Sequence, residues 1–203
     1  MTPDLSAIYD ADFFREYGAE NTTYVNACRF ITEEIFKRFA PRTAVDWGCG
    51  AGLHCACLRE QGVNAIGIDG AVVAREFRAT GAVIRHADLS RPIAPSLTFA
   101  SYDLSLCIDV LEHMHECDAQ VALENVTRGA TTVILSCAPK GQGGHHHVNE
   151  QPRRYWIERM RNIGWQYQRR ETGSLEQFFL KHRDRVPLSW MYHNLCIYRP
   201  IGS

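Results

Sequence analysis

Apolar residues between positions 24 and 39 recur at roughly helical spacing, at Val25, Cys28, Ile31, Ile35, Phe36 and Phe39. This pattern predicts an amphipathic helix, because residues three or four apart share one face of a helix. Pro41 follows and ends the helix, since proline lacks the backbone N–H that a helix interior needs.

Beyond this helix, short apolar segments alternate with stretches of helical periodicity. The short apolar segments predict strands at residues 43–47, 64–68, 82–85, 102–108, 131–137, 165–169 and 191–198. The periodic stretches predict helices at 53–61, 72–79, 119–127 and 151–163, the last with Pro152 in its first turn, where proline is well tolerated. This alternation predicts an α/β fold whose mainly parallel sheet has helices on both faces. In such sheets ligands bind at the carboxyl ends of the strands.

The length of 203 residues suits a single domain, which we divide into an N-terminal lid and helix at 1–40 and a core at 41–203. Hydrophobic residues make up 45% and charged residues 22%, as in ordinary globular proteins. No apolar run approaches the roughly 20 residues that cross a bilayer, and the acidic start of the chain differs from a signal peptide. We therefore expect a cytoplasmic protein that is neither secreted nor embedded in a membrane.

The eight cysteines are scattered through mostly apolar segments, and no two form a C-x-x-C pair. This distribution argues against a disulfide framework and against a thiolate zinc site. Buried, reduced thiols are the simpler interpretation.

The net charge of −1 is unevenly distributed. Residues 140–203 hold eleven Lys and Arg against five Asp and Glu, a balance of +6, so residues 1–139 carry −7. We expect the basic segment to be a solvated face of the last helices. An anionic acceptor or a nucleic-acid backbone is the alternative interpretation.

The segment VDWGCGAG, residues 45–52, ends a predicted strand and begins a predicted helix. Its glycines permit a tight turn and close approach of a ligand to the backbone, which could equally serve a dinucleotide. The spacing is G-x-G-x-G and differs from the G-x-G-x-x-G of pyrophosphate-binding loops. Asp46 would repel phosphates and attract an ammonium group. These features favour S-adenosylmethionine, with contacts from Asp46, Gly48, Cys49, Gly50 and Gly52.

Three further segments follow predicted strands and complete a candidate cofactor site. In IGIDG, residues 66–70, Asp69 can accept hydrogen bonds from both ribose hydroxyls, with Gly70 beside it. In HADLS, residues 86–90, an acid and an amide at Asp88 and Leu89 can contact an adenine edge. The last segment follows the strand at 102–108, where Ile108 would lie beneath the methionine part of the cofactor.

With these four motifs in order, the chain resembles class I S-adenosylmethionine-dependent methyltransferases from about residue 12 onward. It is most similar to a small single-domain group with a glycine-rich GxxHVN-like loop after the fifth strand. The resemblance implies a Rossmann-like, seven-stranded sheet of order 3-2-1-4-5-7-6 with an antiparallel last strand. Trp47 departs from the small or aliphatic residue usual in this family, and we expect it to pack beneath the loop.

Two groups of histidines follow adjacent strands and can meet above the transferred methyl group. His113 follows the fourth strand, and His147 aligns with the histidine of the GxxHVN pattern. A neutral histidine can take the proton of a hydroxyl acceptor near neutral pH. We expect both to be catalytic. Local packing or capping by His113 is the alternative interpretation.

The same histidines, together with an acidic residue, could instead bind a divalent cation. Glu112, His113, His145 and His147 have suitable ligand types. The arrangement is similar to that of the metal-dependent enzymes that methylate the 3′-terminal ribose of small RNAs. Those enzymes have a further carboxylate, where this chain has Asp109, and a distinct segment that HHHVNEQ matches only in part. We therefore expect no metal.

Several residues are candidates to contact the acceptor: Tyr9 and Tyr17 in the N-terminal segment, His145 and Asn149 in the histidine loop, and Tyr155 in the following helix. For the tyrosines, aromatic packing is the alternative interpretation.

We expect methylation of a small molecule, such as a natural-product intermediate, a sugar or an amino acid derivative, with no nucleic-acid or membrane partner. Metal-dependent 2′-O-methylation of RNA ends is the alternative. A non-catalytic domain that binds the cofactor as a sensor is a third possibility, which the histidines beside the glycine loop disfavour.

Overall fold

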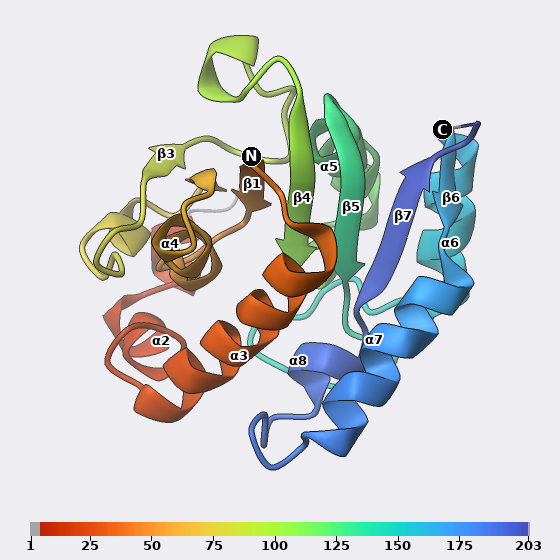
Figure 1. Ribbon diagram of the computed structural model, residues 1–203. Helices are drawn as coiled ribbons and strands as arrows, with labels where there is room; N and C mark the ends of the chain where they lie inside the picture. Colours follow the sequence, from red (N-terminus) through yellow and green to blue (C-terminus); the bar gives the residue numbers. More distant parts are fainter. Residues whose placement is uncertain (1–4, 203) are drawn as a thin grey trace.

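The computed structural model describes residues 5–202, which form a seven-stranded sheet of order β3-β2-β1-β4-β5-β7-β6 (Figure 1). The strands are β1 (Thr43–Trp47), β2 (Asn64–Asp69), β3 (Ile84–His86), β4 (Tyr102–Ile108), β5 (Ala130–Ser136), β6 (Trp165–Tyr167) and β7 (Cys196–Pro200). The first five pair in parallel, and β7 is antiparallel to both β5 and β6. The predicted fold class and strand order are confirmed. The first four residues of the predicted lid lie outside the described residues.

Helices and turns connect and cover the strands. The helices are α1 (Leu5–Ile8), α2 (Ala11–Glu16), α3 (Thr22–Phe39), α4 (Leu53–Glu60), α5 (Glu116–Thr127), α6 (Arg153–Asn162), α7 (Arg169–Lys181) and α8 (Trp190–His193). Three short 3₁₀ turns are η1 (Val72–Arg75), η2 (Pro95–Leu97) and η3 (Leu111–His113). The predicted helix at 24–39 is α3, which Asn21 caps by accepting a hydrogen bond from Tyr24 N.

Successive residues of the central strands pack into two separate cores, one on each face of the sheet. Ala44, Leu104 and Ile134 pack with α3, α4 and α7, while their neighbours Val45 and Val133 pack with α5 and α6. Figure 1 shows α3 and α7 crossing one face of the sheet, with α5 behind the other. Both faces of the sheet are therefore buried, which explains the nearly continuous apolar strands of the sequence.

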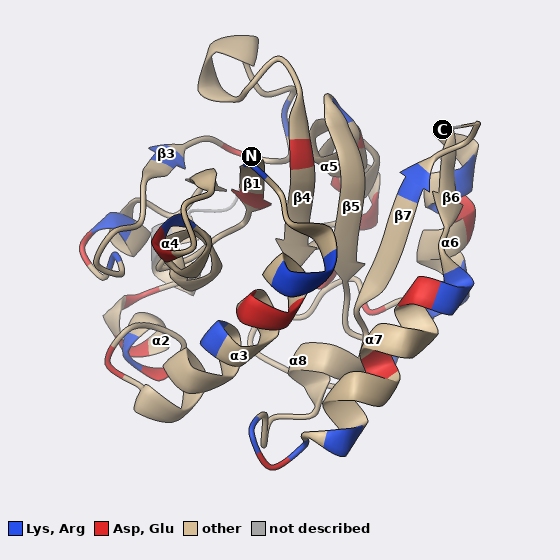
Figure 2. Ribbon diagram, viewed as in Figure 1, with Lys and Arg blue, Asp and Glu red and all other residues tan. Residues whose placement is uncertain are grey.

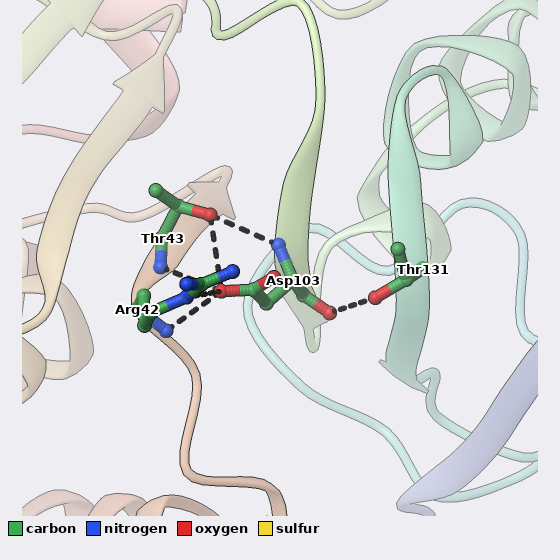
Figure 3. Close-up of polar contacts among 4 residues, drawn as sticks. All are labelled: Arg42, Thr43, Asp103 and Thr131. Carbon is green, nitrogen blue, oxygen red and sulfur yellow. Dashed lines mark hydrogen bonds and ion pairs between the residues drawn. The ribbon is translucent and has the colours of Figure 1, made fainter.

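A polar cluster ties together the amino ends of three strands (Figure 3). Asp103 Oδ2 accepts hydrogen bonds from the backbone N–H groups of Arg42 and Thr43, at 2.7 and 3.1 Å. Thr131 Oγ1 donates to the carbonyl oxygen of Asp103 at 2.8 Å. This cluster sets β1, β4 and β5 in register, so that their opposite ends meet at one edge.

The prediction of a helix at 72–79 was wrong. Only the 3₁₀ turn η1 forms there, because Ala71 N donates to Asp69 Oδ1 and Ala79 N donates to the carbonyl of Ala51. These bonds tie the start of the segment to the end of β2 and its far end to the glycine loop. The third strand also lies slightly later than predicted, at Ile84–His86.

The C-terminal elements differ most from the predictions. Helix α7 was not predicted, although Thr172, Leu175 and Phe179 form its buried face. It begins at Arg169, so the strand predicted at 165–169 ends at Tyr167. The strand predicted at 191–198 was wrong over its first half, because residues 191–193 belong to α8 and β7 begins at Cys196.

Basic residues of the C-terminal segment are interspersed with acidic ones, as both colours along α7 show (Figure 2). Arg153 pairs with Glu176, Arg154 with Glu158, and Arg199 with Glu171. The eight cysteines are all free, and most are buried. Among the described residues, no helix is both long and apolar enough to span a membrane.

Candidate functional site

A cavity of about 710 Å³ lies at the carboxyl ends of β1, β2 and β4. Fourteen of the residues predicted from sequence line it: Tyr9, Tyr17, Asp46, Gly48, Cys49, Gly50, Asp69, Gly70, Asp88, Leu89, Ile108, His113, His145 and His147. Three predicted residues, Gly52, Asn149 and Tyr155, do not line it. The structure therefore brings together residues from five strand ends and from the N-terminal segment.

The glycine loop after β1 is held by β2. Gly48 N and Cys49 N donate to the carbonyl of Ile68, and Gly50 N donates to Asp69 Oδ2 at 2.8 Å. Gly48 has a φ of +65°, and a Cβ there would lie 2.6 Å from the side chain of Val110. Only glycine fits this position, because a side chain would meet both an unfavourable backbone conformation and a clash.

Gly52 is the last residue of the glycine loop and the N-cap residue of α4. Its φ is +75°, and a Cβ would lie 2.8 Å from the Cβ of Ala82. This close packing of the loop on the segment before β3 requires glycine at position 52; the cofactor contact of Gly52 stays a prediction.

Asp46 ends β1 with a buried and incompletely paired carboxyl group. The residue is 3% exposed, and Oδ2 has no hydrogen-bond partner among the described residues. The nearby backbone N–H of Cys55 partly offsets the effect of burial on the pKa of this carboxyl group. Burial raises the pKa of Asp46 to about 7, since a charge is poorly solvated there. A cation at Oδ2 would remove this penalty, so the site fits the ammonium group of a ligand.

Asp69 and Asp88 end two neighbouring strands on the same side of the cavity. Asp69 accepts hydrogen bonds from Gly50 N and from Ala71 N, at 2.8 and 2.7 Å. Burial nevertheless raises the pKa of Asp69. Each of its oxygens retains acceptor capacity, because a carboxylate offers about four lone-pair sites. Two vicinal hydroxyls are suitable donors for these sites.

His113 and His147 meet above the glycine loop. Their ring centroids are 4.8 Å apart in an edge-to-face arrangement. Burial, followed by the neighbouring His147, lowers the pKa of His113 to about 4. His113 is therefore neutral near pH 7, and its buried Nδ1 has no hydrogen-bond partner within residues 5–202.

Glu150 organises the loop that carries His147. Its two carboxylate oxygens accept hydrogen bonds from Gly141 N and Gly143 N, both at 2.7 Å, and Oε1 also lies 2.9 Å from His147 Nδ1. These bonds, with that from His147 the largest cause, hold the pKa of Glu150 below its usual range. An ionised carboxylate only accepts, so His147 Nδ1 donates and Nε2 carries the free lone pair.

The N-terminal segment closes one side of the cavity with aromatic rings. The His145 ring nitrogen Nε2 lies 2.6 Å from the carbonyl oxygen of Ile8 and donates to it. Phe13 and Tyr9 pack against His145 with ring centroids 5.1 and 6.0 Å apart, and Tyr17 contacts Trp190 of α8. The first two helices and the histidine loop thus form one continuous wall.

Asn149 and Tyr155 have structural partners elsewhere. Asn149 is 4% exposed, and both its backbone N–H and its side chain donate to carbonyl oxygens of η3. Tyr155 donates to Glu116 at 2.8 Å on the outer side of α5. The chain therefore leaves the cavity after His147, and these two residues attach the segment that follows the histidine loop to η3 and α5.

The described lining of the cavity contains no Lys or Arg. It does contain six acidic residues, Asp46, Asp69, Asp88, Asp109, Glu112 and Asp118. This charge distribution disfavours phosphates and other anionic ligands.

Three candidate metal ligands converge within the same site. Potential ligand atoms of Glu112, His113 and His147 lie within 4.8 Å of one another. Glu112 Oε1 accepts from Ala138 N at 2.9 Å, whereas the buried Oε2 has no partner in the described part of the chain. Burial, followed by the charge of Asp109, raises the pKa of Glu112 well above its usual range. These three residues can hold a divalent cation, although His145, the fourth residue considered from sequence, is not part of the group.

Among the residues of the site that were not predicted from the sequence are Glu150, His54 and Trp190. Glu150 had one available signal, an acid three residues after a histidine. His54 and Trp190 line the cavity as well, but nothing in their sequence neighbourhood indicated this.

The model of the methyltransferase domain family matches residues 19–182, so the chain belongs to this family. A ubiquinone biosynthesis O-methyltransferase from Methylococcus capsulatus is 27% identical over 103 residues, which are 48% of this chain and 44% of that relative. The matched segment therefore spans less than half of that relative's length.

Two solved structures share the fold. A 1,6-didemethyltoxoflavin N1-methyltransferase from Burkholderia thailandensis, with its substrate and S-adenosylhomocysteine bound, is 16% identical, with a TM-score of 0.62 and coverage of 100% of this chain and 92% of that one. A magnesium protoporphyrin IX methyltransferase from Synechocystis is 18% identical, with a TM-score of 0.59 and coverage of 80% and 89%.

Proposed function

We propose that this methyltransferase transfers a methyl group from S-adenosylmethionine to a hydroxyl group of a small molecule that carries no negative charge. The acceptor would be a natural-product intermediate, a sugar or an amino acid derivative. The observation that carries the proposal is the cavity itself, which combines an aromatic wall and a histidine pair with a described lining free of Lys and Arg.

The cofactor would lie across the carboxyl ends of the strands. Asp69 would bind the ribose hydroxyls, Asp88 and Leu89 the adenine, and Asp46 the ammonium group, with Ile108 beneath the methionine part. The unpaired Oδ2 of Asp46 supports this placement, because a buried anion gains most from a cation. The cofactor supplies a methyl group on a positively charged sulfur.

The acceptor would bind between the histidine pair and the aromatic wall of Tyr9, Phe13, Tyr17 and Trp190. Aromatic rings favour apolar or planar groups, and the acidic lining repels carboxylates and phosphates. His147 Nε2 would take the hydroxyl proton while Glu150 holds Nδ1–H in place. His113, neutral and in contact with His147, would position the acceptor.

The relatives agree with a small acceptor. One is named for ubiquinone biosynthesis, and the two structural neighbours act on 1,6-didemethyltoxoflavin and on magnesium protoporphyrin IX. We also infer one domain over residues 1–203, with 1–40 as lid and first helix, within the small group that has the GxxHVN-like loop. Eight free cysteines suit a reducing compartment such as the cytoplasm.

A second candidate keeps methyl transfer but adds a divalent cation. The unpaired atoms Glu112 Oε2 and His113 Nδ1 favour it, because a cation would satisfy both. Metal-dependent methylation of RNA ends would use such a cation, but the described lining offers no basic side chain for the RNA backbone.

Transfer of labelled methyl groups from S-adenosylmethionine to separate small-molecule, RNA and protein fractions tests the proposal. We expect label in the small-molecule fraction. Label confined to RNA would support the second candidate, and no label in any fraction would point to a cofactor-binding sensor.

A further inference from the structure

His54 lies in the first turn of α4 and lines the cavity, yet nothing in the proposed reaction uses it. Its Nδ1 is 2.6 Å from Thr32 Oγ1 on α3. The Thr32 hydroxyl donates its only proton to the carbonyl of Cys28 at 2.7 Å, so His54 Nδ1 must donate to Thr32. The other ring nitrogen, Nε2, has no hydrogen-bond partner among the described residues.

The position of His54 relates it to the amino acid end of the cofactor. Asp46 and His54 line the same cavity, and the carboxyl group of Asp46 lies close enough to the backbone N–H of Cys55, the next residue, for that group to lower its pKa. An ammonium group on Asp46 Oδ2 therefore lies beside the start of α4. The carboxylate of the cofactor is attached to the same carbon as this ammonium group, so it must bind within the same neighbourhood.

Few donors are available there for a carboxylate. The backbone N–H groups of Gly48, Cys49 and Gly50 already donate to Ile68 and Asp69. The described lining of the cavity has no Lys or Arg. Of the lining side chains contributed by α3 and α4, only His54 can carry a positive charge.

We propose that His54 binds the carboxylate of the cofactor and takes up one proton as the cofactor binds. This inference rests on the proposed placement of the cofactor. In the free protein, burial lowers the pKa of His54 to about 4, so the ring is neutral near pH 7. The incoming carboxylate stabilises the imidazolium, with Nε2–H donating to the carboxylate and Nδ1–H to Thr32.

The titratable groups near His54 do not replace it. Burial raises the pKa of Tyr24 and of Cys28 on α3, so both stay neutral. Asp46 on β1, with its pKa raised to about 7, would release a proton when it binds the ammonium group. This release offsets the proton uptake by His54. It occurs equally in the wild type and in any His54 variant, so it cancels when the two proteins are compared.

Calorimetry of S-adenosylhomocysteine binding near neutral pH, in buffers of different ionisation enthalpy, measures both affinity and proton uptake. We expect His54→Gln to weaken binding about 10- to 100-fold, the effect of losing a hydrogen bond to a charged group. It should also take up about one proton fewer per bound molecule than the wild type. 5′-Methylthioadenosine lacks the amino acid end, so its affinity should be the same for both proteins.

Two further variants control for indirect effects. His193→Gln changes a histidine whose side chain is 42% exposed and outside the cavity, and it should bind like the wild type. Tyr24→Phe removes the competing hydroxyl donor of α3 and should leave the proton uptake unchanged.

Unchanged affinity and proton uptake in His54→Gln would overturn the proposal. Equal weakening of both ligands would also overturn it, because that result indicates a structural role. Both readouts concern binding alone, whereas failure of the proposed function would appear as absent methyl transfer.

Discussion

Glu150 Oε1 lies 2.9 Å from His147 Nδ1, and the same oxygen accepts the backbone N–H of Gly143. One carboxylate therefore fixes both the shape of the loop after β5 and the orientation of the histidine within it. The free lone pair of His147 is placed at Nε2, the atom that the proposed reaction requires. Orientation of a base by a second group in this way is a recurring feature of catalytic histidines.

Substitution of Gly144 should disable His147 without changing the histidine itself. A Cβ at Gly144 would lie 2.4 Å from His147 Nε2, and the φ of +157° is unfavourable for any side chain. We expect Gly144→Ala to lower turnover by an amount approaching that of removing the histidine, as measured by steady-state methyl transfer. Gly143→Ala is the matched control, because Gly143 also has a positive φ but has open space around it. Full activity of Gly144→Ala would show that Nε2 needs no clear approach.

Asp46→Asn should stabilise the free protein while abolishing tight cofactor binding. Burial raises the pKa of Asp46 from 3.8 to about 7, so the folded state holds one more proton than the unfolded state between these pH values. Stability due to this group therefore falls as pH rises through that window. The substitution removes the penalty, which is on the order of 1–3 kcal/mol.

Thermal unfolding without ligand measures this effect. The gain from Asp46→Asn should be larger at about pH 8 than at about pH 5. Asp103→Asn is the control of opposite sign, because backbone N–H groups lower the pKa of Asp103 in spite of desolvation. If Asp46→Asn is less stable than the wild type at both pH values, the carboxyl group of Asp46 stabilises the free protein, which contradicts the prediction.

The fold could be predicted because it depends on regular features of the sequence. Parallel strands end at one edge of a sheet, so Asp46, near the end of one predicted strand, and Asp69 and Asp88, after two others, were expected to lie near one another, and all three line the cavity. The two-sided burial of β1 and β4 made those strands mostly apolar, and their predicted bounds match the observed ones.

The remaining features depend on tertiary contacts. Helix α7 begins with charged residues and contains Gly173, so its buried face is visible only against α3 and β7. Asn149 and Tyr155 were predicted to contact the acceptor but do not line the cavity, because they form hydrogen bonds with η3 and α5. Glu150 follows a histidine by three residues, but its hydrogen bonds within the loop, like the bond between His54 and α3, depend on partners that local sequence patterns do not specify.

Removal of divalent cations separates a histidine base from a metal-assisted reaction. Because His147 Nε2 can accept a proton unaided, we expect dialysis against EDTA to leave methyl transfer largely intact. Loss of activity that magnesium or manganese restores would instead assign Glu112, His113 and His147 as metal ligands. Binding of manganese alone, measured by calorimetry, gives a readout that is independent of the acceptor.

The most direct test of the account is the turnover of His147→Ala with an acceptor found by labelled methyl transfer, set against its affinity for S-adenosylhomocysteine. We expect turnover to be lower by about 10²- to 10⁴-fold, the usual contribution of a general base, with cofactor affinity nearly unchanged. Glu150→Gln should lower turnover in the same direction but by less, because the ring remains while its orientation is lost. Unchanged turnover and acceptor affinity in His147→Ala would contradict the account and make His147 a residue of the loop surface.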